Sequence, residues 1–278
     1  MPAPQADAMK NFARLKFMSF NLKVPTNWRN PQGDAGAMYD GAFKDNEKTS
    51  TPGSPPLFQP ASLNKYDTDV QKMQIATVGG FIDSISSAIC DAWGKWQNLA
   101  TMAGVVIIGP VATMGQLIGP PLTPLILASA PKSSPQQLKY ANAVATVIGT
   151  AWLAYTATIK LPGLPIYPAF AACPSPVAPP IPNTPFPIAG AMQVTASLTP
   201  ALMKMQMQAM LGDPTAPFHG ELFEAICDGF DKCFKIWQTT TMVTNIIGTG
   251  AVPSMALVPP VPGPVTGGIG TMAPGGLK

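Results

Sequence analysis

A helical period of apolar residues dominates the first half of the chain. Apolar side chains recur at three- and four-residue intervals between Val70 and Val106, with Ile82, Ile89 and Trp93 among them. This spacing predicts a long amphipathic helix, which we place at 67–108. Small polar residues at 67–69 supply the cap, and Gly109-Pro110 supplies the end, because proline lacks an amide donor.

The motifs around the end of this helix occur twice in the chain. The first copy reads Ala88-Ile89-Cys90-Asp91, Trp96-Gln97, Ile107-Ile108-Gly109 and Pro120-Pro121. The second copy reads Ala225-Ile226-Cys227-Asp228, Trp237-Gln238, Ile246-Ile247-Gly248 and Pro259-Pro260. We therefore predict a duplicated unit in which an amphipathic helix runs into an uncharged glycine- and proline-rich segment.

Two further helices are expected between the copies. Ser133-Ser134 precedes Pro135, which is a favourable first helical residue, so a helix is predicted over 135–160. Its stretch Tyr140–Ile159 is uncharged and long enough to span a bilayer, although its Asn, Thr and Ala content favours a buried core helix. A short methionine-rich helix is predicted from Thr199-Pro200 to Gly212.

Other parts of the chain show no sustained period. Residues 1–66 contain scattered proline and glycine, which predicts an extended arm, with a short strand at Lys16–Val24. Residues 161–189 contain ten prolines and are expected to form an extended, packed strap. The predicted fold class is thus mainly α, with two long helices in a duplicated helix-plus-proline-segment unit. The expected divisions are an arm at 1–66, a first unit at 67–190 and a second at 191–278.

Charge is scarce and unevenly placed. Only 11% of the 278 residues are charged, against about 25% in ordinary soluble domains. No charged residue lies between Lys95 and Lys132, between Lys160 and Lys204, or between Lys235 and Lys278. Such segments indicate either a membrane protein or a subunit whose surface is covered by partners. The proline runs fit lipid poorly and favour the subunit. A net charge of +3 without a basic stripe argues against nucleic acid as a partner.

The sequence contains no recognisable catalytic or metal-binding constellation. His219 is the single histidine, and the cysteines Cys90, Cys173, Cys227 and Cys233 lack metal-ligand spacing. No glycine-rich segment is followed by the lysine of a phosphate-binding loop. We therefore predict no enzyme activity, no cofactor and no metal. Cys90 and Cys227 occupy equivalent points of the two copies and could approach each other, but buried core thiols are the preferred interpretation.

One proline-rich segment resembles a known family. Cys173-Pro174-Ser175-Pro176, with Pro179-Pro180-Ile181-Pro182-Asn183 and Pro185-Phe186-Pro187, is similar to the Cys-x-Thr-Pro and Val-Pro-Ile-Pro-Tyr-Pro-Asn runs of PAAR-like spike-tip proteins. The Gly-Thr-Gly-Ala-Val-Pro run at 248–253 looks like phage structural proteins. The resemblance implies a tail, baseplate or spike component that acts by assembly. The metal-binding histidines of the spike-tip family have no counterpart here.

The expected function is a non-enzymatic structural component of a phage tail, a baseplate or spike, or a contractile injection assembly. Its partners would be other subunits, in a homo-oligomer or hetero-oligomer, within a virion or injection particle assembled in the cytoplasm. The residues expected to make these contacts are Trp96, Trp237, Pro120, Pro121, Pro259, Pro260, Phe17 and Trp28.

Two alternatives remain at this point. The first is a membrane-inserting protein or effector whose helices 67–108 and 135–160 enter a bilayer. The second is an adaptor whose proline-rich 161–189 is recognised by another protein.

Overall fold

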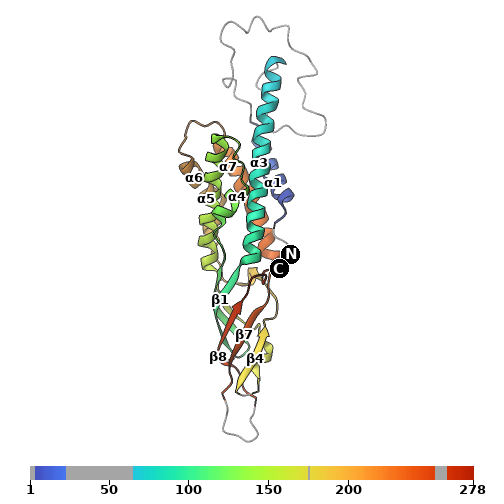
Figure 1. Cartoon of the computed structure of the whole chain (residues 1–278), viewed down its shortest axis with the longest axis vertical. Helices are drawn as coiled ribbons and strands as arrows, with labels where there is room; N and C mark the ends of the chain where they lie inside the picture. Colours follow the sequence, from blue (N-terminus) through green and yellow to red (C-terminus); the bar gives the residue numbers. More distant parts are fainter. Residues whose placement is uncertain (1–3, 23–64, 175, 254–261) are drawn as a thin grey trace.

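The protein is a rod with helices at one end and a β-sheet at the other (Figure 1). This computed structural model describes residues 4–22, 65–174, 176–253 and 262–278, with side chains from residue 73 onward in the first long helix. The described part is 54% helix and 22% strand. The prediction of a mainly α fold is therefore wrong, because the end of the first predicted helix and the uncharged proline- and glycine-rich segments form a six-stranded sheet.

Six α-helices and one large sheet make up the described fold. The helices are α1 (Ala6–Ser19), α3 (Lys65–Leu99), α4 (Leu122–Ser129), α5 (Pro135–Thr158), α6 (Pro200–Leu211) and α7 (His219–Thr240). The large sheet contains β1 (Thr101–Ile108), β2 (Val111–Ile118), β3 (Leu161–Leu164), β4 (Val177–Pro182), β7 (Ile246–Ala251) and β8 (Thr266–Met272). These strands are antiparallel in the order β3-β2-β1-β8-β7-β4, and β5 (Phe186–Pro187) pairs separately with β6 (Met242–Val243).

Two helix predictions between the copies are confirmed. Helix α5 begins at Pro135, and the Ser134 side chain accepts a hydrogen bond from the Gln137 amide at 3.2 Å. Helix α6 ends at Gly212, whose φ of 62° lies in the left-handed region that suits glycine. Local capping chemistry was sufficient to predict both boundaries.

The first long helix ends earlier than predicted. Helix α3 stops at Leu99, and the residues expected to continue it form β1. Met102, Val105 and Ile107 of β1 are buried, and Gly109-Pro110 makes the reversal into β2. The uncharged segment that follows forms β2 and then the separate helix α4. Pro124 is tolerated in α4 because it lies in the first turn, where no intrahelical acceptor is required.

The N-terminal segment is helical where an extended arm was predicted. Helix α1 replaces the expected strand at Lys16–Val24 as far as Ser19. It buries Met9, Ala13 and Phe17, which are spaced four residues apart, against α3 and α7. The contact with α7 is close, because a Cβ on Gly229 would lie 3.1 Å from the Met9 carbonyl oxygen.

The duplicated unit consists of a helix followed by a β-hairpin. Helix α3 leads into β1 and β2, and α7 leads through β6 into β7 and β8. Strands β1 and β8 are neighbours, so both copies contribute to one sheet. The uncharged C-terminal segment contributes strand β8, which pairs with β1 on one side and β7 on the other.

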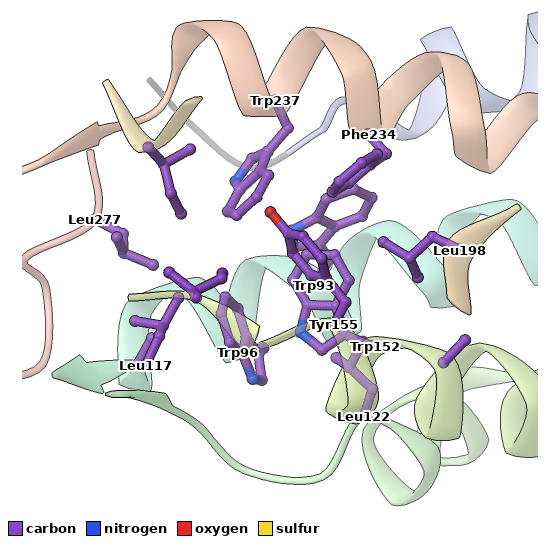
Figure 2. Packing of buried hydrophobic residues seen from close by; sticks show 14 of the residues in the cluster. Trp93, Trp96, Leu117, Leu122, Trp152, Tyr155, Leu198, Phe234, Trp237 and Leu277 are labelled. Carbon is purple, nitrogen blue, oxygen red and sulfur yellow. The ribbon is translucent and has the colours of Figure 1, made fainter. Parts of the chain in front are cut away.

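The core of the helical end is an aromatic cluster drawn from three helices. Trp93 and Trp96 of α3, Trp152 of α5, and Phe234 and Trp237 of α7 point toward one another (Figure 2). The ring centroids of Trp93 and Trp152 are 4.7 Å apart, and those of Trp96 and Trp152 are 4.9 Å apart. Aromatic pairs at this separation add to the free energy of apolar burial, so the cluster fixes how the two copies meet.

Candidate interaction surface

The sheet end of the rod is built without charge. None of the six strands of the large sheet contains Asp, Glu, Lys or Arg. Described ion pairs lie instead on the helices, including Arg14 with Asp83 and Lys16 and Lys204 with Glu224. The molecule is thus divided along its length into a charged helical end and an uncharged sheet end.

The inner face of this sheet is covered by the proline-rich strap. Between β3 and β4 the chain forms the short 3-10 helix η4 (Pro168–Ala171), with Tyr167 and Phe170 stacked at 5.0 Å between ring centroids. The Tyr167 hydroxyl donates to the Ile246 carbonyl at 2.7 Å. Gly248 permits this approach, because a Cβ there would lie 2.8 Å from the Tyr167 ring. The segment 161–189, expected to be an extended strap, thus supplies strands β3 and β4 and the packed connection between them.

The outer face of the sheet is apolar and exposed. Val106 of β1 pairs with Thr113 of β2 and with Ile269 of β8, and Ile269 pairs with Thr249 of β7. These four residues form one row across the sheet, since directly opposed residues share a face. Ile269 is 65% exposed at the centre of the row. Ile108 and Ile247, on the same face, are also exposed.

Three threonine hydroxyls on this side of the sheet are already engaged within the chain. Thr249 Oγ1 donates to the Ala178 carbonyl at 2.9 Å, and Thr113 Oγ1 donates to the Val106 carbonyl at 3.4 Å. Thr101 Oγ1 donates to the Ile118 carbonyl, also at 3.4 Å. Burying a hydroxyl that keeps its hydrogen bond costs far less free energy than burying an unpaired one. The face is therefore suited to being covered.

Both edges of the sheet are blocked by proline. Strand β3 contains Pro162, and strand β4 contains Pro179, Pro180 and Pro182. Proline cannot donate a ladder hydrogen bond, so such edges discourage the addition of another strand. A partner is thereby directed to the outer face. We define the outer face by Val106, Ile108, Thr113, Ile247, Thr249 and Ile269.

The residues predicted to make partner contacts lie mostly elsewhere. Trp96, Trp237 and Phe17 are buried within the chain, with at most 2% of each side chain exposed. Pro120 and Pro121 lie between β2 and α4, half-buried and exposed respectively. Trp28, Pro259 and Pro260 fall outside the described residues. The outer face itself was missed, although the β-branched residues of 101–118 and their lack of charge were signals for it.

Two hollows in the described structure lie apart from this surface and are lined mainly by residues of the helical end. One, of about 770 Å³, is lined by Cys90, Asp91, Lys95 and Asn98 of α3 and by Lys278. Burial raises the pKa of the Cys90 thiol to about 12, with smaller contributions from Cys233 and Asp91, so it stays protonated and weakly nucleophilic.

The second hollow, of about 420 Å³, is mainly apolar. It is lined by aromatic and aliphatic side chains of α1, α3, α5 and the start of α7, namely Phe17, Val78, Phe81, Tyr140, Phe218 and Leu222. Its rim also includes Asp213, whose carboxylate accepts a hydrogen bond from the Thr215 hydroxyl at 2.8 Å.

The titratable residues of the described chain lie in scattered positions. His219 lies at the start of α7, where its ring contacts the Gln208 side chain at 3.3 Å and the Ala216 carbonyl. No cluster of three or more His, Cys, Asp or Glu side chains suited to a metal occurs among the described residues. All four cysteines are buried free thiols. Cys90 contacts Met9 at 3.7 Å and Cys227 contacts Met207 at 3.8 Å.

Comparisons of the chain with protein-family models, with curated proteins and with solved structures gave no match.

Proposed function

We propose that the protein is a non-enzymatic structural subunit of a phage tail, baseplate or spike, or contractile injection assembly. It acts by burying apolar surface against partner subunits. The observation that carries the proposal is the outer face, which is uncharged and exposed on a sheet with proline-blocked edges. Exposed apolar surface of this kind marks a site of association in a protein that works in water.

The division of charge along the rod supports the same function. Ion pairs keep the helical end suited to water, whereas the sheet end has no charged strand residue (Figure 1). A subunit that inserts its sheet end among neighbours would leave the helical end accessible. The choice of a phage or injection assembly rests on the resemblance of 173–187 to the proline runs of spike-tip proteins and of 248–253 to phage structural proteins.

Incorporation into a particle tests this function. The full chain, tagged and produced in its native host, should co-sediment with tail or injection particles on a density gradient, with mass spectrometry of the fractions as the readout. Ile269→Lys should reduce the incorporated amount at least about tenfold, because a lysine would be buried unpaired. Leu153→Lys is the matched control, since Leu153 is 62% exposed on helix α5 and is not part of the sheet. Absence of the wild-type chain from all particle fractions would reject the proposal.

A membrane-inserting protein is the second candidate function. One described helix segment, Met73–Leu99 of α3, is long and apolar enough to cross a bilayer. In this fold its residues Ile85, Trp93 and Trp96 are buried against other helices, and Asp83 pairs with Arg14. Insertion would therefore require the bundle to open. Retention of the chain in membranes after carbonate washing would favour this function over assembly.

A further inference from the structure

We propose that the outer face of the sheet binds the same face of a second copy, giving a two-fold dimer with two sheets packed face to face. This inference deepens the proposed function, on which it rests, by naming the first partner of the interaction surface. The occupant is argued from the chemistry, the size and the surroundings of the face.

The chemistry of the face suits a copy of itself. In a two-fold interface each residue of the patch meets the same patch on the partner, so any charge would face a like charge nearby. The strands that build this face contain no charged residue, so two copies meet without repulsion. By the same reasoning a strongly charged partner would find no complementary group here.

The shape of the face also suits sheet-on-sheet packing. Sheets pack about 10 Å apart by interlocking branched side chains from their facing surfaces. The row of Thr113, Val106, Ile269 and Thr249 provides branched residues on four neighbouring strands. The threonine hydroxyls in this row donate to main-chain carbonyls of their own sheet. Their hydrogen bonds would thus survive burial.

The face is large enough for a stable contact. Strands lie about 4.8 Å apart and rise about 3.3 Å per residue, so six strands of this length cover a footprint of roughly 600 Å². This is of the order of the roughly 800 Å² of accessible surface that each partner buries in a standard interface. Proline at both edges prevents growth by strand addition, so the contact closes at two copies.

Analytical ultracentrifugation of the full chain tests the dimer. At micromolar concentrations we expect twice the chain mass of 29.1 kDa. Ile269→Lys and, separately, Ile108→Lys should each weaken dimerisation by about 100-fold or more, because the substitution buries two unpaired lysines per dimer. Both side chains are more than half exposed, so the monomer should keep its circular dichroism spectrum and thermal midpoint. Leu153→Lys, at equal exposure on α5, should dimerise like the wild type.

Three results would overturn the inference. The first is a wild-type chain that stays monomeric at about 100 μM, a concentration near the weak limit of specific association. The second is a mass that corresponds to three or more copies. The third is a dimer that persists in both the Ile269→Lys and the Ile108→Lys variants. Failure here is separable from failure of the proposed function. A monomer that enters particles through the same face would leave that function intact, whereas a dimer found in no particle would remove it.

Discussion

The indole nitrogen of Trp237 donates a hydrogen bond to the side-chain oxygen of Gln97 at 2.9 Å, joining the ends of the two duplicated helices. The Gln97 amide nitrogen in turn donates to the Leu277 carbonyl at 3.3 Å. Gln97 is only 3% exposed. One buried side chain thus links α3, α7 and the C-terminal segment at the junction of the helical and sheet ends.

Replacing Gln97 should destabilise the fold. Gln97→Leu keeps the approximate volume but leaves the indole N–H of Trp237 without this acceptor, and we expect a loss of about 2–3 kcal/mol in the free energy of unfolding. Urea unfolding followed by tryptophan fluorescence measures it. Gln238→Leu is the control, because Gln238 occupies the equivalent point of the second copy and is half-buried. It should cost less than about 0.5 kcal/mol. Equal losses in the two variants would show that Gln97 has no special part in the junction.

Gly248 is predicted to be essential to the packing of the strap on the sheet. A Cβ at this position would lie 2.7 Å from Ile107 Cδ1 and 2.8 Å from the Tyr167 ring, both buried. Gly248→Ala should therefore lower the free energy of unfolding by about 1–3 kcal/mol through overpacking. The same substitution at Gly80, an exposed helical position with open space around its Cβ, should raise it by about 0.5–1 kcal/mol. A neutral Gly248→Ala would mean that Tyr167 moves freely.

Part of this fold is readable from local signals. The Ser134 cap, the Pro135 start and the Gly212 end all act within a few residues, and the helices they bound were predicted correctly. The repeat was also visible in the sequence. Its matching residues Trp96 and Trp237 each lie three residues before the end of their helix. Each of these features can be read from residues that are close to one another in the sequence.

The sheet was not predicted, because several of its strands pair with strands that are far away in the sequence. β1 follows α3 after one residue, and its apolar residues continue the helical spacing as far as Val106. It pairs with the adjacent strand β2 and, on its other side, with β8, more than half the chain away. Pro162 and Pro182 argued against strands, yet both lie at sheet edges, where a missing amide donor is tolerated. The uncharged, β-branched residues of 101–118 were a signal for such a surface, but which residues share the outer face follows only from that topology.

The ion pair between Arg14 and Asp83 is predicted to hold α1 against α3. Arg14 Nε and Nη2 donate to the two carboxylate oxygens at 2.7 and 2.6 Å, and the Asp83 side chain raises the pKa of Arg14. Both side chains are more than a third exposed, so a double-mutant cycle with Arg14→Gln and Asp83→Asn should give a coupling of about 1 kcal/mol or less. The same cycle on Lys10 and Asp7, a pair within α1 whose Asp7 is 89% exposed, should give almost none. The difference between the two coupling energies should shrink in high salt. Equal coupling energies for the two pairs would contradict the prediction that Arg14 and Asp83 link α1 to α3.

Buried thiols are predicted to make the fold sensitive to alkali. Burial raises the pKa of Cys227 to about 12, with a smaller contribution from Glu224, and raises that of Cys233 to about 11. The folded state holds these thiols protonated, whereas the unfolded chain ionises them near their ordinary pKa of 9.0. Their contribution to the free energy of unfolding is therefore complete below about pH 9. It should be lost as the pH rises from there toward 12.

Urea unfolding at several pH values between 7 and about 11 checks this decline. The buried hydroxyls of Tyr155 and Tyr167 also have raised pKa values and contribute above about pH 10, so the thiol share needs its own control. Cys227→Ala removes one of these thiols. Between pH 9 and 10 the free energy of unfolding of this variant should therefore fall measurably less than that of the wild type, whatever its stability at pH 7. An identical pH dependence in the two proteins would mean that Cys227 ionises equally in the folded and unfolded states.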